Sequence, residues 1–357
     1  MKNNIYVSGK KEFGFLDSGI GEFVYLVIQY LIIALLYMAL SLGLPRGSVV
    51  NEVASFLIEI GFLATVFIVA LATKTNVFKA TKLNTKPKTY QVALTAVIAL
   101  IAYFGFSAMT NAFIDFLELV GYSSSSSPIV VNVWWKYLLY TFTMAAVPAF
   151  CEELLFRGLI YQGLRKWSKV GAVFISALLF MLMHGSPDQT VHQFILGIIL
   201  ALVFNATGSI WCPMLLHFLN NFIALTLSFI YSQAGDASVA ETASESVQTY
   251  SPWTVWIVEL FIAFGVATVA AFLIWTIIKS LKKQRLEEKN ENKIEITKAE
   301  DGKQIVDISA LSDENSVKTA TEAPEKTNNT IAVVLFVLAG VWVSIDWIWA
   351  LVTGLLK

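Results

Sequence analysis

Nine stretches of apolar residues, separated by short polar loops, make up most of this 357-residue chain. A helix needs about 20 predominantly apolar residues to cross the hydrocarbon core of a bilayer, and most of the stretches reach that length. The pattern predicts an all-α fold, a polytopic membrane helix bundle of about eight core transmembrane helices plus one C-terminal transmembrane helix. The expected spans, of which the fifth and sixth are short, are 23–43, 53–73, 90–110, 133–160, 170–185, 191–206, 210–231, 253–279 and 330–355.

Composition agrees with a membrane protein and excludes a water-soluble globule. Hydrophobic residues make up 56% of the chain and charged residues 14%, whereas a soluble domain carries roughly 25% charged residues. The lipid bilayer is therefore an expected partner. The formal net charge of −1 gives no basic face for a polyanion, so no nucleic acid is expected. Cys151 and Cys212 both lie in apolar segments and are expected to be buried thiols rather than a disulfide.

Basic residues alternate between the loops, which predicts an orientation. Lys and Arg precede the first span and follow the second, fourth and eighth, while the other loops are almost free of them. Cytoplasmic loops are enriched in these residues, so we expect a cytoplasmic N-terminus in an integral, multi-pass protein. The expected organisation is a cytoplasmic N-terminus (1–22), N-terminal transmembrane helices (23–129), a core (130–235), an extracytoplasmic loop with the eighth span (236–280), a disordered cytoplasmic linker of polar composition (281–329) and a C-terminal transmembrane helix (330–357).

Polar residues gather inside one apolar part of the chain. A charged group within a span costs at least about 2.5 kcal/mol on insertion scales and commonly marks a functional site. Residues four apart share a helix face, which pairs Glu153 with Arg157, Phe180 with His184, and His217 with Asn221. Glu152 is rotated by about 100° from Glu153. One glutamate can therefore be neutralised by the arginine while the other faces a substrate.

These residue types suit the hydrolysis of an amide. A glutamate and a histidine can hold and deprotonate water, and a second histidine with an asparagine amide can stabilise an oxyanion. Glu152, His184 and His217 could instead bind zinc, because two histidines and a carboxylate form a known catalytic zinc set. The spacing does not choose between the two chemistries.

The depths expected for His184 and His217 in the membrane disagree. If their helices run straight from the cytoplasmic side, His217 lies about 10 Å in and His184 about 20 Å in, at about 1.5 Å per residue. They have to meet at one depth, so a helix is expected to tilt or break. Pro148 and Pro213 are the candidate kinks.

The three motifs E-E-x-x-x-R, F-x-x-x-H and H-x-x-x-N, in this order, resemble the CAAX-protease and bacteriocin-processing (CPBP) family over about residues 130–235. The resemblance implies an all-helical membrane fold like that of the type II CAAX prenyl endopeptidase. It also implies that Glu152 and His184 activate water and that His217 and Asn221 form the oxyanion site. Phe180, Glu153 and Arg157 would be supporting residues, and a bacterial cell membrane would be the location.

The sequence thus predicts an intramembrane endopeptidase that cleaves a peptide bond near a membrane-associated or C-terminal segment of a peptide or protein substrate. A metal-free glutamate mechanism without a cofactor is favoured, with a zinc-dependent metalloprotease as the alternative. A second alternative is a non-catalytic peptide-binding or bacteriocin immunity protein. A transporter ranks last because the inverted repeats typical of that class are not visible. The substrate and the oligomeric state stay open.

Overall fold

A computed structural model describes residues 12–41, 48–124, 131–234, 251–301 and 326–357. Eight helical segments of this part are long and apolar enough to cross a membrane, and α8 is a shorter apolar helix. The predicted polytopic all-α bundle is therefore confirmed. The helices are α1 (Phe15–Ser41), α2 (Ser48–Ala72), α3 (Val77–Ala80), α4 (Thr89–Leu119), α5 (Trp134–Tyr140), α6 (Val147–Glu153), α7 (Tyr161–Trp167), α8 (Lys169–Leu182), α9 (Thr190–Thr207), α10 (Trp211–Ala234), α12 (Pro252–Asp301) and α13 (Lys326–Leu355). Which side of the membrane each end faces stays a prediction.

The fourth span is interrupted by two π-helical turns. Between α5 and α6 lies η1 (Thr141–Ala146), and between α6 and α7 lies η2 (Leu154–Ile160). Pro148 stands at the start of α6, where its missing N–H cannot bond a carbonyl four residues earlier. Single π-helical turns within helices are frequent at functional sites. The glutamate pair of the first motif therefore lies on a short α-helix between two π-helical turns.

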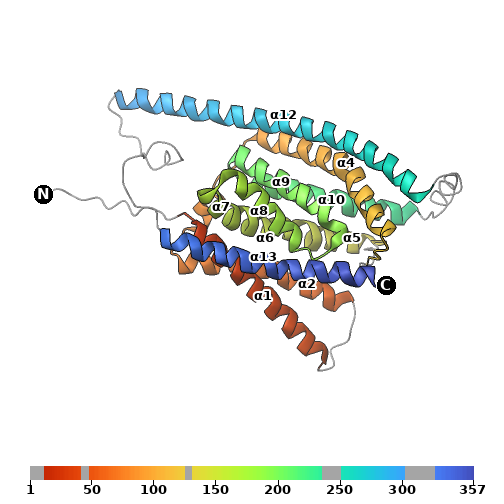
Figure 1. The fold of residues 1–357 in the computed structure, drawn as a ribbon. Coiled ribbons are helices and arrows are strands. Elements are labelled where there is room, and N and C mark those ends of the chain that lie inside the picture. Colours follow the sequence, from red (N-terminus) through yellow and green to blue (C-terminus); the bar gives the residue numbers. More distant parts are fainter. Residues whose placement is uncertain (1–11, 42–47, 125–130, 235–250, 302–325) are drawn as a thin grey trace.

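The centre of the bundle is formed by this interrupted span. All seven residues of η2 are buried, and α1, α2, α8 and α9 pack against it. In Figure 1, α4 and α12 run along one side of α6 to α10, and α1, α2 and α13 along the other. Gly163 on α7 permits close contact with α1, because a Cβ there would lie 1.6 Å from Ser18 Oγ. The interrupted span is therefore enclosed on both sides.

One predicted element is wrong in part. The disordered linker expected over 281–329 is helical at its beginning, because α12 continues without a break to Asp301. Two contacts give the physical reason. Leu281 is fully buried, and Lys88 at the start of α4 forms a 2.8 Å ion pair with Glu288. The end of that predicted linker begins α13, and the part in between lies outside the described residues.

Candidate active site

Glu153 and Arg157 form a buried ion pair. Arg157 Nη1 lies 2.7 Å from Glu153 Oε1, and both side chains are fully buried. Arg157 Nη2 also donates to the carbonyl of Gly197 on α9 at 3.1 Å, and the guanidinium carbon lies 4.5 Å from the ring centroid of Phe180. The arginine thus joins η2 to α8 and α9, and the pairing expected from the four-residue spacing is present.

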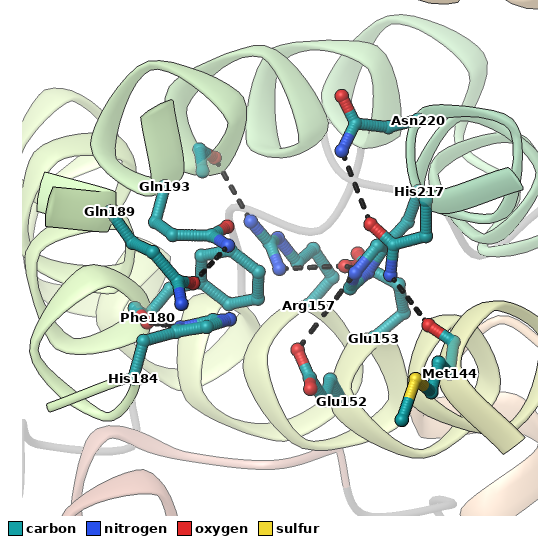
Figure 2. Close-up of polar contacts among 12 residues, drawn as sticks. Met144, Glu152, Glu153, Arg157, Phe180, His184, Gln189, Gln193, His217 and Asn220 are labelled. Atoms are coloured by element: carbon teal, nitrogen blue, oxygen red, sulfur yellow. Dashed lines mark hydrogen bonds and ion pairs between the residues drawn. The ribbon is translucent and has the colours of Figure 1, made fainter. Parts of the chain in front are cut away.

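His217 connects the two glutamates of the first motif (Figure 2). Its Nδ1 lies 3.1 Å from Glu153 Oε1, and because an ionised carboxylate only accepts hydrogen bonds, this nitrogen carries a proton. Its Nε2 lies 4.0 Å from Glu152 Oε2. Glu153 therefore orients the imidazole, in the way that a carboxylate orients the histidine of a hydrolase triad.

Glu152 is a buried carboxylate that is not engaged by a cation. Its side chain is 7% exposed, and Oε2 is buried without a hydrogen-bond partner. A water about 2.8 Å from both Glu152 Oε2 and His217 Nε2 would make an angle of about 90° between them, which is a usable hydrogen-bond geometry. The 4.0 Å separation of these two atoms therefore allows one water to bridge them.

A second carboxyl group lies near Glu152. Glu59 on α2 is close enough to Glu152 for the two groups to interact electrostatically, and α2 packs against α6. In the sequence Glu59 is an acidic residue within the second apolar stretch, and no motif includes it. The partner was not predictable because the two residues lie on helices far apart in the chain.

Asn221 belongs to a hydrogen-bond chain that ends at a histidine outside the motifs. Its Nδ2 donates to the carbonyl of Met144 at 3.2 Å, and its Oδ1 accepts from Asn220 Nδ2 at 3.1 Å. The same nitrogen of Asn220 lies 3.2 Å from His192 Nε2. Sequence reasoning missed His192 and Asn220. The doublet of asparagines at the end of the third motif was the only signal that pointed to them.

His184 lies in the turn that follows α8. Its Nδ1 is 2.8 Å from the carbonyl of Phe180, which leaves Nε2 as the free ring nitrogen. Phe180 also contacts both histidines, with ring centroids 5.1 Å from His184 and 5.7 Å from His217. In Figure 2 the imidazole of His184 extends toward Glu152. No direct hydrogen bond or ion pair joins His184 to Glu152 in the part of the chain that the structure describes.

The zinc alternative does not fit this arrangement. Within the described ranges, no three His, Cys, Asp or Glu side chains are placed to hold one metal ion. The proposed ligand set of Glu152, His184 and His217 is thus not assembled. The preference for a metal-free site nevertheless stays a prediction, to be decided by experiment.

The comparisons with known proteins agree with the motifs. A family model described as Type II CAAX prenyl endopeptidase Rce1-like matches residues 134–223, the part of the chain that runs from α5 to α10 and holds all three motifs. No curated protein and no solved structure matches the chain. The segment 134–223 therefore matches the CAAX protease family that the three motifs predict, as a domain of the Rce1-like type II CAAX prenyl endopeptidase kind.

Proposed function

We propose that the protein is an intramembrane endopeptidase that hydrolyses a peptide bond near a membrane-associated or C-terminal segment of its substrate. One observation carries the proposal. Within the family-matched segment, a buried carboxylate oxygen of Glu152 without a hydrogen-bond partner faces the imidazole of His217 at 4.0 Å. A carboxylate oxygen without a hydrogen-bond partner beside an oriented imidazole is the arrangement that hydrolysis of an amide needs.

In the proposed first step, Glu152 acts on a water molecule. Its carboxylate removes a proton from the water, while His184, through its free Nε2, accepts the water's second hydrogen in a hydrogen bond. The resulting hydroxide attacks the carbonyl carbon of the scissile bond. The carbonyl oxygen then becomes the oxyanion of a tetrahedral intermediate. This step assigns to Glu152 and His184 the roles that the family resemblance implies.

In the second step, His217 and Asn221 stabilise the oxyanion and the peptide bond breaks. Protonated His217 donates from Nε2 and Asn221 donates from Nδ2. The bond of His217 Nδ1 to Glu153 at 3.1 Å supports the positive charge of the imidazole. Glu152 returns its proton to the leaving nitrogen, and the products are an amine and a carboxylic acid, which then loses its proton to solvent.

Glu153 is not the base in this scheme. Its Oε1 oxygen is engaged by Arg157 at 2.7 Å and by His217 at 3.1 Å, and a carboxylate held by two donors is a poor proton acceptor. The two adjacent glutamates thus have different tasks because their surroundings differ. Glu153 and Arg157 hold His217 in place.

The test is peptide cleavage by the purified protein. Wild type, Glu152→Gln and Glu259→Gln are incubated with a panel of C-terminal and leader-type peptides, and products are identified by mass spectrometry. Glu259 lies on α12, outside the site, and is exposed, so Glu259→Gln is a matched control. We expect Glu152→Gln to lose about 10²- to 10⁴-fold in rate, the usual contribution of a general base, and the control to keep its activity.

Addition of a zinc chelator distinguishes the glutamate mechanism from the zinc-dependent one. Cleavage that is unchanged by the chelator supports the glutamate mechanism. Loss of cleavage on chelation, with recovery on added zinc, would support the metalloprotease alternative instead. A folded wild type that binds the peptides but cleaves none would favour the non-catalytic peptide-binding protein.

A further inference from the structure

We propose that His192 and Asn220 are positioning residues that orient the amide of Asn221, so that one of its N–H groups is available to the oxyanion. The inference rests on the proposed function of the site. It adds two residues whose identity none of the three motifs specifies. Each of the three side chains is connected to the next by a direct hydrogen bond, and the chain ends at a backbone carbonyl of η1.

Asn220 is the centre of this chain. Its side chain is buried, with the residue 4% exposed. An amide nitrogen carries two hydrogens, and Asn220 Nδ2 has two acceptors, His192 Nε2 at 3.2 Å and Asn221 Oδ1 at 3.1 Å. This assignment requires a neutral His192 whose proton is on Nδ1. His192 therefore determines which way the Asn220 amide faces.

Two hydrogen bonds, one to the oxygen and one from the nitrogen, fix the orientation of the Asn221 amide. Its Oδ1 accepts from Asn220, and its Nδ2 donates to the Met144 carbonyl at 3.2 Å. A rotation of the amide by 180° would place nitrogen against nitrogen and oxygen against oxygen at these two contacts. One hydrogen of Asn221 Nδ2 has no acceptor in this chain of bonds. Asn221 lies on the same helix face as His217, which comes one turn earlier in α10.

The Met144 carbonyl lacks its α-helical donor because of a proline. In a continuous α-helix this carbonyl would accept from the N–H four residues later, but that residue is Pro148, which has none. The amide of Asn221 donates to it instead. The proline at the start of α6 thus contributes to the position of a donor on α10.

Preorganised donors stabilise a developing oxyanion because no reorganisation is needed during the reaction. If Asn220 loses its contact with His192, its amide can rotate, and Asn221 then loses the donor that defines its Oδ1. We therefore expect the effect of His192 to reach the reaction only through Asn221. This dependence distinguishes a positioning role from general packing.

The kinetic test is a double-mutant cycle on peptide cleavage. His192→Phe keeps a planar ring but removes the acceptor, and we expect kcat to fall about 3- to 10-fold with KM nearly unchanged, the scale of one hydrogen bond. His192→Gln restores an acceptor oxygen and should recover most of the rate. In an Asn221→Ala background His192→Phe should cause no further loss. An equal loss in both backgrounds would overturn the proposal.

A second measurement does not need a substrate. The chain has three histidines, so ¹⁵N-histidine labelling gives three ring systems to assign by NMR in detergent micelles. We expect an unprotonated, hydrogen-bonded Nε2 on His192 that shifts in Asn220→Leu, while the signals of His184 stay constant. An unchanged His192 signal in folded Asn220→Leu would overturn the proposal. An inactive wild type with the expected His192 signal would count against the proposed function alone.

Discussion

Replacing Arg157 by methionine tests the buried ion pair that supports the site. The pair is 2.7 Å long with both side chains fully buried, and the arginine also donates to Gly197 and packs on Phe180. Arg157→Met would leave the Glu153 carboxylate buried, with His217 as its one remaining partner among the residues that the structure describes. Removal of one member of a buried pair costs about 3–5 kcal/mol, because an uncompensated charge remains. We expect a loss of unfolding free energy of about this size.

The assay is equilibrium unfolding in mixed micelles with increasing denaturing detergent. Lys166→Met is the matched control, because it removes a cation from an ion pair of similar length, 2.6 Å to Glu12, whose side chains are each 54% exposed. Exposed pairs contribute at most about 1 kcal/mol. The double replacement Glu153→Gln with Arg157→Met should regain part of the loss. Equal costs for Arg157→Met and Lys166→Met would refute the reasoning.

Three further substitutions, one of them a control, probe the same bundle. Gly163→Ala would place a Cβ 1.6 Å from Ser18 Oγ and should destabilise by at least about 1–3 kcal/mol through overpacking. Gly265→Ala, with nothing within 4 Å of its added Cβ, should leave the unfolding midpoint unchanged or slightly raised, and equal effects would contradict this. Pro148→Ala would give the Met144 carbonyl an N–H of its own helix and should lower kcat severalfold, on the scale of one hydrogen bond. An unchanged kcat would contradict the assigned role of the proline.

The features that the sequence predicted depend on the spacing of residues within one helix. The helices follow from the apolar runs, and the contact of Glu153 with Arg157 follows from residues four apart on one helical segment. The contact of His217 with Glu153 joins residues 64 positions apart. No periodicity within one helix can specify it, although the family resemblance implies that the motifs meet.

The predictions that failed depend on tertiary contacts, which neither composition nor local motifs can specify. The segment after Lys279 is polar enough to remain disordered by itself, yet the buried Leu281 and the ion pair of Lys88 with Glu288 attach it to the bundle as a helix. His192 matches no motif and lies near a loop. Its partner Asn220 comes 28 residues later, so nothing near His192 in the sequence indicates a role in the site.

The two prolines that could have explained the depths of His184 and His217 have different effects, because they occupy different positions in their helices. Pro148 and Pro213 are equally plausible kinks from the sequence. Pro213 lies in the first turn of α10, where its missing N–H has no intrahelical partner to lose, so it does not break the helix. Pro148 follows the π-helical turn η1 inside a long span, and there the missing N–H leaves a carbonyl that Asn221 can bond. His184 reaches the site differently, because α8 ends at Leu182 and the histidine lies in the turn beyond it. The second motif therefore reaches the site through the end of α8, while the interruption lies in the span that carries the first motif.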